Sequence, residues 1–242
     1  MIEFLKKLQR AVFPEDYTCV YCGREIFNGK EVCDDCLRSL PFNDGYICDR
    51  CGRKTSAPAL VCDACANKDI FFDGARSVFL YESPVSTAIK GLKYFGKKYL
   101  VREFSREMAR VYLKAFYSCD AILPVPAYYK HERERGYNQS ELLSLALGER
   151  LDIPVITDAV IKTRDTVSQV KLSAKERFIN LSGSFRISDK SKVKDKRLLV
   201  VDDVMTTGAT LNAIARALKK AGAAEVYGVT VASVDLLPSQ RP

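Results

Sequence analysis

The sequence predicts an α/β fold, in which a mostly parallel sheet is flanked by helices and preceded by a small metal-binding module. Two observations lead to this prediction. Eight of the nine cysteines lie between residues 19 and 65, and beyond them apolar, strand-like runs alternate with helical ones. With 47% hydrophobic residues among 242, the chain can form a sizeable core. We therefore expect an N-terminal amphipathic helix at 1–18, a cysteine module at 19–68 and an α/β domain at 69–242.

The first segment, MIEFLKKLQRAVF, has charges at helical spacing and no small-residue cleavage site. It therefore predicts an amphipathic helix rather than a signal peptide. No apolar run approaches the roughly 18 residues that a membrane span requires. We expect a cytoplasmic protein without a membrane span, in which thiols stay reduced.

The clustered cysteines form four C-x-x-C pairs, which are Cys19/Cys22, Cys33/Cys36, Cys48/Cys51 and Cys62/Cys65. Two such turns supply the four ligands of a tetrahedral zinc site. The pattern therefore predicts two structural zinc ions, although iron–sulfur clusters and redox dithiols use the same residues. Because thiolates fill all four positions of each site, neither ion has an open position for catalysis.

The cysteine module is also an internal repeat. CVYCGREIFNGKEVCDDC aligns with CDRCGRKTSAPALVCDAC at an offset of 29, which matches every cysteine, Gly23 with Gly52, Arg24 with Arg53, and Asp34 with Asp63. A tandem duplication favours one ion in each copy, although a cross-braced arrangement would use the same cysteines.

The net charge of +8 favours phosphates or nucleic acid among the ligands. The cysteine module does not share this excess, because residues 19–65 hold six Lys or Arg against seven Asp or Glu. A phosphate-binding surface needs excess positive charge, so the module is better suited to a scaffold or interaction role.

The strands and helices of the second part follow one another along the chain. SVFLY, DAILPVP, RLLVVDD and EVYGVTVASV have the composition of buried strands. SPVSTAIKGLKYF, KYLVREFSREMARVYLKAFY, NQSELLSLALGERL and TTGATLNAIARALKKAG have helical periodicity. Parallel sheets of this kind bind ligands at the carboxyl ends of their strands.

The most informative strand end is LLVVDDVMTTGATLN. Asp202 and Asp203 end a buried strand, and the small residues 206–210 lead into a helix. A bare turn at a helix start offers backbone N–H groups, hydroxyls and the positive dipole end to a phosphate. Paired carboxylates beside it suit a diol or a metal ion instead. A phosphate and a diol a few ångströms apart describe a ribose 5-phosphate.

This stretch contains neither a P-loop nor a dinucleotide fingerprint. VVDDVMTTGATL instead resembles the 5-phosphoribosyl-1-pyrophosphate (PRPP) motif of type I phosphoribosyltransferases. The resemblance implies that Asp202 and Asp203 hold the ribose hydroxyls. It implies that the 5-phosphate is bound by Thr206, Thr207, Gly208, Ala209 and Thr210.

A second strand end, PVPAYYKHERERGYNQ, predicts a basic loop. Guanidinium groups bind phosphate bidentately, and Gly136 lets the backbone approach a ligand closely. His131, the only histidine, lies in this loop, where a general-base role and a solvated role are both open. A third segment, IKTRDTVSQVKLSAKERFINL, is long, polar and basic, and predicts a functional loop or disorder with a helix capped by Ser173.

Together these segments resemble the ComF/ComFC family of competence-associated proteins, which join an N-terminal zinc module to a type I phosphoribosyltransferase domain. The resemblance covers nearly the whole chain and includes Pro124-Val125-Pro126, Arg135-Gly136-Tyr137-Asn138-Gln139 and the K-x-x-K-Y segment at Lys90. It implies phosphoribosyl transfer from PRPP, with Mg²⁺ bridging the pyrophosphate and the ribose hydroxyls. The remaining site residues that we assign are Arg133, Arg135, Arg164 and Arg177 in catalysis and Lys90, Lys93, Gly136, Asn138 and Gln139 in PRPP binding.

No residue cluster identifies the acceptor, so a non-catalytic alternative stays open. In it, the protein binds PRPP or a nucleotide and acts through single-stranded DNA or through competence-machinery proteins such as a helicase. Arg102, Arg106, Arg110 and Lys114 recur every four residues and form a basic ridge, opposite a core-facing stripe at Leu100, Phe104, Met108, Val111 and Ala115. Glu103 and Glu107 partly neutralise this ridge, which is equally typical of a solvated helix face.

Overall fold

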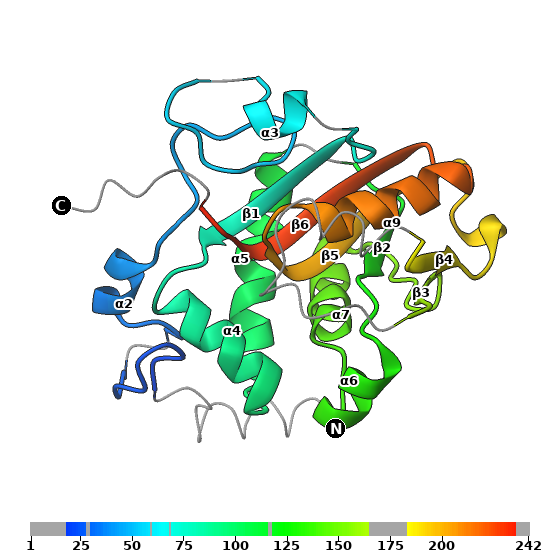
Figure 1. Cartoon of the computed structure of the whole chain (residues 1–242). Coiled ribbons are helices and arrows are strands. Elements are labelled where there is room, and N and C mark those ends of the chain that lie inside the picture. Colours follow the sequence, from blue (N-terminus) through cyan, green and yellow to red (C-terminus); the bar gives the residue numbers. More distant parts are fainter. Residues whose placement is uncertain are drawn as a thin grey trace.

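The computed structural model describes residues 18–27, 30–58, 60–67, 69–115, 118–164 and 183–235 (Figure 1). The predicted N-terminal helix, apart from residue 18, lies outside the described residues. So do Arg177 and the helix predicted to begin at Ser173.

A four-stranded sheet forms the centre of the α/β part. Its strands are β1 (Gly74–Leu80), β2 (Ala121–Pro124), β5 (Arg197–Met205) and β6 (Glu225–Ser233), in the order β1-β6-β5-β2. Every neighbouring pair in it is parallel. The predicted parallel sheet is therefore confirmed, and its strands are almost continuously apolar because helices cover both faces.

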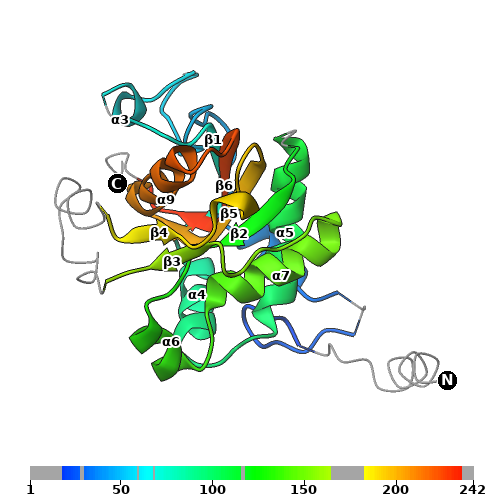
Figure 2. The same cartoon turned by 90° about the vertical axis from the view of Figure 1, so that its right-hand side faces the viewer.

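Figures 1 and 2 show the helices on the two faces of the sheet. One face carries α4 (Val85–Tyr94), α5 (Leu100–Lys114) and α7 (Gln139–Leu151), and the opposite face carries α9 (Ala209–Lys220). All four helices were predicted by their periodicity. Each face has its own apolar core, and the carboxyl ends of the central strand β5 and of its edge neighbour β2 lie between the two layers.

Four short elements of the α/β part were not predicted. The segment expected as a basic loop contains helix α6 (Tyr129–Arg135), which Gly136 ends in the left-handed conformation with φ at 77°. Strands β3 (Val160–Lys162) and β4 (Phe185–Ile187) form an antiparallel pair, and η2 (Lys190–Lys192) follows them. These elements are too short to show periodicity, and α6 buries none of its residues.

The cysteine module repeats its structure as it repeats its sequence. In each copy the second C-x-x-C begins a short helix, α2 (Asp34–Ser39) in the first and α3 (Asp63–Ala66) in the second. Cys19, Cys33 and Cys36 of the first copy pack in a small cluster, which Val20 and Tyr21 connect to the core on the α5 face. Cys48, Cys51 and Cys65 of the second copy instead belong to the core on the α9 face of the sheet.

The basic ridge of α5 is present, but the two glutamates expected beside it are buried. Glu103 and Glu107 are buried, with 0% and 5% of their surface exposed. Arg106 lies 2.7 Å from Glu103, and Arg110 lies 2.8 Å from Glu107. The expected neutralisation is confirmed, and two of the ridge cations are bound to carboxylates beneath them.

Candidate functional site

Asp202 and Asp203 lie in the second half of strand β5, which continues to Met205. Asp203 is buried and Asp202 is half-buried. Asp202 Oδ1 accepts a hydrogen bond from Ser140 Oγ at 2.9 Å and another from the backbone N–H of Asp203 at 2.9 Å. Ser140 lies in the first turn of α7, so the packing of α7 on β5 orients this carboxylate.

Lys93 provides the counter-charge for Asp203. Its Nζ lies 2.6 Å from Asp203 Oδ2, and its side chain is 23% exposed. Burial lowers the pKa of Lys93, but the nearby Asp203 carboxylate outweighs this effect, so that the pKa lies above its ordinary value. Lys93 is therefore a charged residue at the edge of the acidic pair.

The surroundings of Asp202 favour the uncharged form of its carboxyl group. Burial is the main cause and the charge of Asp203 the second, and together they raise the pKa of Asp202 to about 7. Lys93 and the two hydrogen bonds oppose this rise without cancelling it. Around neutral pH the carboxyl group can both donate and accept hydrogen bonds, as can the hydroxyls of a diol.

The turn after β5 has the geometry expected of a phosphate cradle. Gly208 adopts φ of 76° as the N-cap of α9, and no side chain caps the free N–H groups of the first turn. Thr207 Oγ1 is buried and has no hydrogen-bond partner among the described residues. The turn thus combines the positive end of a 12-residue helix with an unused hydroxyl.

The carboxylates and the turn face one cavity of about 700 Å³. Cations reach it from three different elements, which contribute Lys93, Arg135 and Lys162. Arg135 Nη1 donates to Gln139 Oε1 at 3.0 Å, and its guanidinium lies 5.2 Å from the centre of the Tyr94 ring. The remaining wall includes Tyr81, Tyr128 and Tyr137. Such a cavity can bind a polyanionic sugar phosphate with an aromatic surface at its side.

The structure brings most of the predicted site residues together. The cavity is lined by Asp202, Asp203, Thr206, Thr210, Lys93, Arg135, Asn138 and Gln139. Asn138 also caps α7, because its side chain accepts from the Ser140 N–H. Gly208 and Ala209 line a smaller hollow next to the cavity, below the turn.

Other predicted residues lie elsewhere. Lys90 and Arg133 are exposed and do not line the cavity. Arg164 is exposed as well, and its Nε donates to Ser184 Oγ at 3.0 Å. His131 does line the cavity, with Nδ1 at 3.5 Å from Glu134 Oε2.

Ser140 and Tyr81 are the cavity residues that sequence reasoning missed. Ser140 contacts Asp202 across 62 positions of sequence. The N-terminal position of Ser140 in a predicted helix was visible, but its partner depends on how α7 packs against β5. Tyr81 directly follows a strand that was identified by its apolar residues alone.

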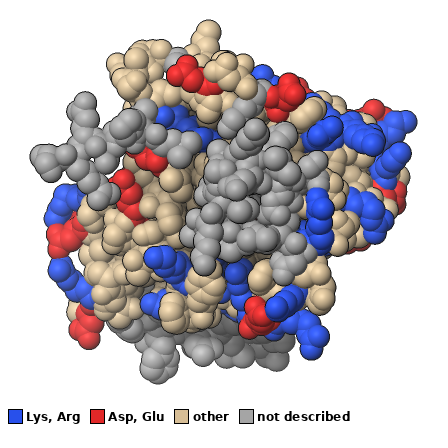
Figure 3. All heavy atoms as spheres, viewed as in Figure 1, with Lys and Arg blue, Asp and Glu red and all other residues tan. Residues whose placement is uncertain are grey.

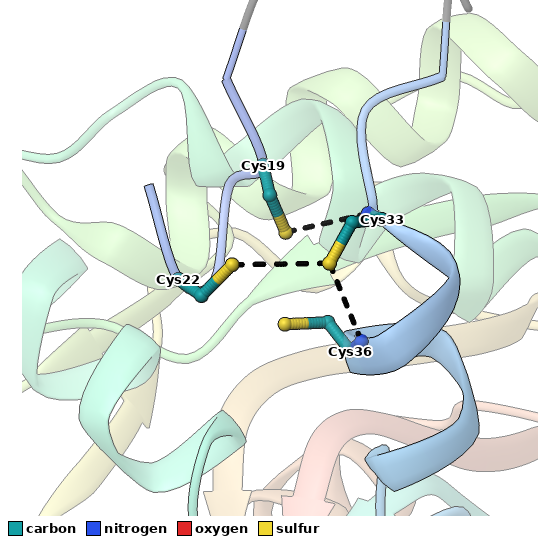
Figure 4. A group of neighbouring side chains, drawn as sticks. All are labelled: Cys19, Cys22, Cys33 and Cys36. Atoms are coloured by element: carbon teal, nitrogen blue, oxygen red, sulfur yellow. Dashed lines mark hydrogen bonds between the residues drawn. The ribbon is translucent and has the colours of Figure 1, made fainter. Parts of the chain in front are cut away.

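The eight module cysteines form two separate four-thiol centres. The sulfurs of Cys19, Cys22, Cys33 and Cys36 lie within 4.8 Å of one another, and so do those of Cys48, Cys51, Cys62 and Cys65. Figure 4 shows the first four thiols converging from one tight turn and from the start of α2. Sequential pairing is therefore confirmed over cross-bracing.

The spacing of the thiols fits zinc. A tetrahedron with Zn–S bonds of about 2.3 Å has edges of about 3.8 Å. Cys22 Sγ lies 3.8 Å from Cys33 Sγ, and Cys51 Sγ lies 3.7 Å from Cys62 Sγ. Backbone N–H groups also point at the sulfurs, as from Cys33 to Cys19 Sγ at 3.4 Å. Each group of four thiols can hold one structural zinc ion.

Surface charge is uneven. Figure 3 shows Lys and Arg gathered at the right of the view, over the connection from β4 to β5. The sequence there places a lysine at every second position, at Lys190, Lys192, Lys194 and Lys196. In the part of the chain that the structure describes, no helix is both long and apolar enough to cross a membrane.

Two known families match parts of the chain. Residues 8–66 match the family described as double zinc ribbon domain, and residues 140–235 match the family described as phosphoribosyl transferase domain. The second match includes the acidic pair, the bare turn and α9.

Individual relatives match the chain as well. Competence protein F of Haemophilus influenzae is 31% identical over 86% of this chain and 81% of its own length. The DNA utilization protein YhgH of Escherichia coli is 35% identical over 60% of this chain and 66% of its own. Among solved structures, the purine phosphoribosyltransferase of Pyrococcus horikoshii aligns with a TM-score of 0.36 at 23% identity, over 58% of this chain and 80% of that one.

Proposed function

The chain belongs to the competence protein F family, and we propose that its α/β domain binds PRPP and transfers the phosphoribosyl group to an acceptor. The names of the relatives, competence protein F and DNA utilization protein, support a role in the uptake or processing of DNA. The observation that supports PRPP best is the shared cavity of the acidic pair and the bare turn. Asp202, Asp203, Thr206 and Thr210 line the same cavity, as binding of the diol and the 5-phosphate of one ribose requires.

We assign the ribose hydroxyls to Asp202 and Asp203 and the 5-phosphate to the turn at 206–210. The N–H groups at the start of α9 and the hydroxyls of Thr206, Thr207 and Thr210 are the donors available to the phosphate. Lys93 Nζ lies 2.6 Å from Asp203 Oδ2 and provides the counter-charge for this carboxylate, which accepts hydrogen bonds from the diol.

We place the pyrophosphate against Arg135 and Lys162, which line the same cavity. In the transfer, the bond between C1 of the ribose and the pyrophosphate oxygen breaks, and a new bond forms from C1 to the acceptor. Positive charge develops on the ribose and negative charge on the leaving group. Arg135 and Lys162 stabilise the leaving group, and the tyrosines of the wall help to exclude water.

Magnesium fits this site as a companion of the substrate. Mg²⁺ is commonly held by one or two carboxylates together with substrate phosphates. Asp203 is already paired with Lys93, and Asp202 accepts two hydrogen bonds. We therefore expect the pyrophosphate oxygens to provide most of the ligands of the metal. When bound, the ion neutralises charge on the pyrophosphate oxygens.

A second candidate function is binding of PRPP or a nucleotide without turnover. Of the four arginines assigned to catalysis, only Arg135 lines the cavity among the described residues. The domain would then act as an accessory whose partners are single-stranded DNA or competence-machinery proteins, including a helicase. We propose that the cysteine module at 19–68 contributes a scaffold or a docking surface to either function.

The experiment for this proposal follows binding and release separately. The zinc-loaded protein is titrated with PRPP and Mg²⁺ by calorimetry, and pyrophosphate release is then followed with a panel of purine and pyrimidine bases. Binding with release for one base supports transfer and identifies the acceptor. Binding without release for any base favours the accessory function. Absence of binding contradicts both.

A further inference from the structure

The two copies of the cysteine repeat differ in how they use one equivalent arginine. Arg24 of the first copy is exposed and forms an ion pair with exposed Asp35. Arg53, its counterpart in the second copy, is only 7% exposed. A duplication that began with two equivalent side chains therefore has one in solvent and one inside the molecule.

The burial of Arg53 follows from the docking of the second copy on the start of β1, which Figures 1 and 2 both show. The Ala75 N–H donates to the Arg50 carbonyl at 2.7 Å, and Arg76 Nη1 donates to the Asp49 carbonyl at 2.7 Å. Gly52 is in such close contact that a Cβ on it would overlap the Ala75 carbonyl oxygen. Gly23, its counterpart, has no neighbour within 4 Å of that position.

This docking brings the guanidinium of Arg53 against the phosphate turn. Its Nη2 lies 3.4 Å from the position that a Cβ on Gly208 would occupy, and Met205 Sδ and Phe72 Cε1 lie 3.9 and 4.0 Å from the same point. Arg53 Nε is buried and has no hydrogen-bond partner among the described residues. A buried cation with an unused donor is costly unless an anion compensates it.

The chain that follows the second copy is tied to the same helix start. Asn212, in the first turn of α9, accepts from the Phe71 N–H at 2.7 Å and donates to the Asp69 carbonyl at 2.8 Å. Asn212 itself is 4% exposed. The second cysteine copy and the phosphate turn are therefore parts of one packed unit, which also contains Cys48, Cys51 and Cys65.

We propose that Arg53 is a positioning residue for the phosphate turn, and that it couples the second zinc site, but not the first, to binding of the ribose phosphate. The guanidinium supports the turn at Gly208 and adds positive charge behind the N-terminus of α9. A phosphate held there compensates the buried cation. This inference rests on the proposed function, because it takes the ligand of the turn to be a phosphate.

The coupling must work in both directions. If the second zinc unit holds Arg53 in the place where it strengthens phosphate binding, then bound phosphate strengthens the hold on that zinc ion by the same factor. Among the described residues the first zinc site has no such connection, since Arg24 is exposed and the first copy contacts α5, through Tyr21 and the ion pair of Glu31 with Arg102, instead of the phosphate turn. The two ions are therefore expected to respond differently to the same ligand.

The test compares Arg53→Gln and Arg53→Lys with the matched control Arg24→Gln, all as full-length, zinc-loaded proteins. PRPP with Mg²⁺ is titrated by calorimetry, and zinc content is measured for each variant. We expect Arg24→Gln to bind like the unaltered protein. We expect Arg53→Gln to bind roughly 10- to 100-fold more weakly, the range expected for loss of a charged contact, with two zinc ions retained. Arg53→Lys, which keeps the charge, restores part of the affinity.

A second measurement distinguishes coupling from a purely structural role of Arg53, because a structural role would not make zinc release depend on PRPP. Zinc release by a thiol-modifying reagent is followed with and without PRPP, in the unaltered chain and in Cys19→Ser/Cys22→Ser, which keeps only the second site. We expect PRPP to slow the release of one of the two ions, and this protection to persist in the double variant. Because this zinc-release measurement does not need the Arg53 variant, it tests the coupling even if Arg53→Gln fails to fold.

The outcomes separate the inference from the function on which it rests. If the unaltered protein does not bind PRPP, the proposed function fails and the inference fails with it. If it binds PRPP but Arg53→Gln binds equally well, or PRPP protects both zinc ions alike or neither, only the inference is overturned.

Discussion

Lys93 Nζ lies 2.6 Å from Asp203 Oδ2, so a cation that the sequence assigns to PRPP binding is paired with one member of the acidic pair. Asp203 is 5% exposed at its side chain, and a second carboxyl, Asp202, is its sequence neighbour. Two carboxylates in a buried site repel each other unless a cation or a proton compensates one of them. Lys93 compensates Asp203, and the raised pKa of Asp202 reflects the remaining repulsion and burial.

Removing this cation is expected to destabilise the fold. Lys93→Ala leaves Asp203 buried and unpaired, and we expect the free energy of unfolding to fall by about 1–3 kcal/mol, less than for a fully buried pair because Lys93 is partly exposed. Urea denaturation measures the change. Lys90→Ala, on the exposed side of the same helix, is the stability control and should change it by less than about 0.5 kcal/mol. Equal effects of the two variants would contradict this account of the ion pair.

Glu103 predicts a pH dependence of stability. It is fully buried, and burial in the first place, followed by Glu107 and Glu31, raises its pKa to about 7 against the pull of Arg106. The folded state therefore binds an extra proton between the ordinary pKa of a glutamate and about 7. Its stabilising contribution is complete below that range and is lost as the pH rises through it.

Glu103→Gln removes this titration. Its stability relative to the unaltered protein should increase by roughly 1.4 kcal/mol between pH 6 and pH 8, which corresponds to about one pKa unit of linkage. Denaturation curves at the two pH values measure this difference. Glu149→Gln, at an exposed position, should show no such trend. A Glu103→Gln difference that stays constant with pH would mean that Glu103 titrates normally.

The two zinc sites should differ in what their loss does to the α/β domain. Cys19→Ser/Cys22→Ser and Cys48→Ser/Cys51→Ser should each lose one zinc equivalent by metal analysis. The first pair should leave the melting of the α/β domain nearly unchanged, because its thiols pack in a separate cluster. The second pair should lower it strongly, because Cys48 and Cys51 lie in the core shared with α9. Similar melting of both variants would contradict the shared core.

The duplicated glycines provide a matched pair for the docking surface. Both adopt positive φ, 73° at Gly23 and 66° at Gly52, so an alanine is strained equally at either position. Only Gly52 meets another backbone, that of Ala75. We therefore expect Gly52→Ala to destabilise the protein by about 1–3 kcal/mol more than Gly23→Ala. Thermal melting with zinc present compares them, and equal losses would exclude close docking at β1.

Local patterns predicted the parts of this molecule that are continuous in sequence. The strand, acidic pair, bare turn and helix at 198–220 were predictable because one segment contains them all. The pairing of the cysteines followed from a repeat whose copies each close on themselves. The start of α7 was predicted as part of a binding site because it lies in the same continuous segment as the basic residues before it.

The contacts that complete the site were not predictable from such patterns. Lys93 with Asp203, Ser140 with Asp202, and Arg53 with Gly208 join residues from different elements. Each depends on how helices or the second cysteine copy pack on the sheet, which periodicity does not specify. Arg24 and Arg53 show this most clearly, because the repeat aligns them and only the fold distinguishes them.

The most direct test of the central claim is the affinity for PRPP with Mg²⁺, measured by calorimetry on the unaltered protein and on Asp202→Asn/Asp203→Asn. Circular dichroism and zinc content establish that the double variant is folded. We expect binding by the unaltered protein and none by the double variant, because neither side chain is then a carboxyl group that can bind the ribose hydroxyls. Retained affinity in a folded double variant would contradict the assignment of the acidic pair to the ribose.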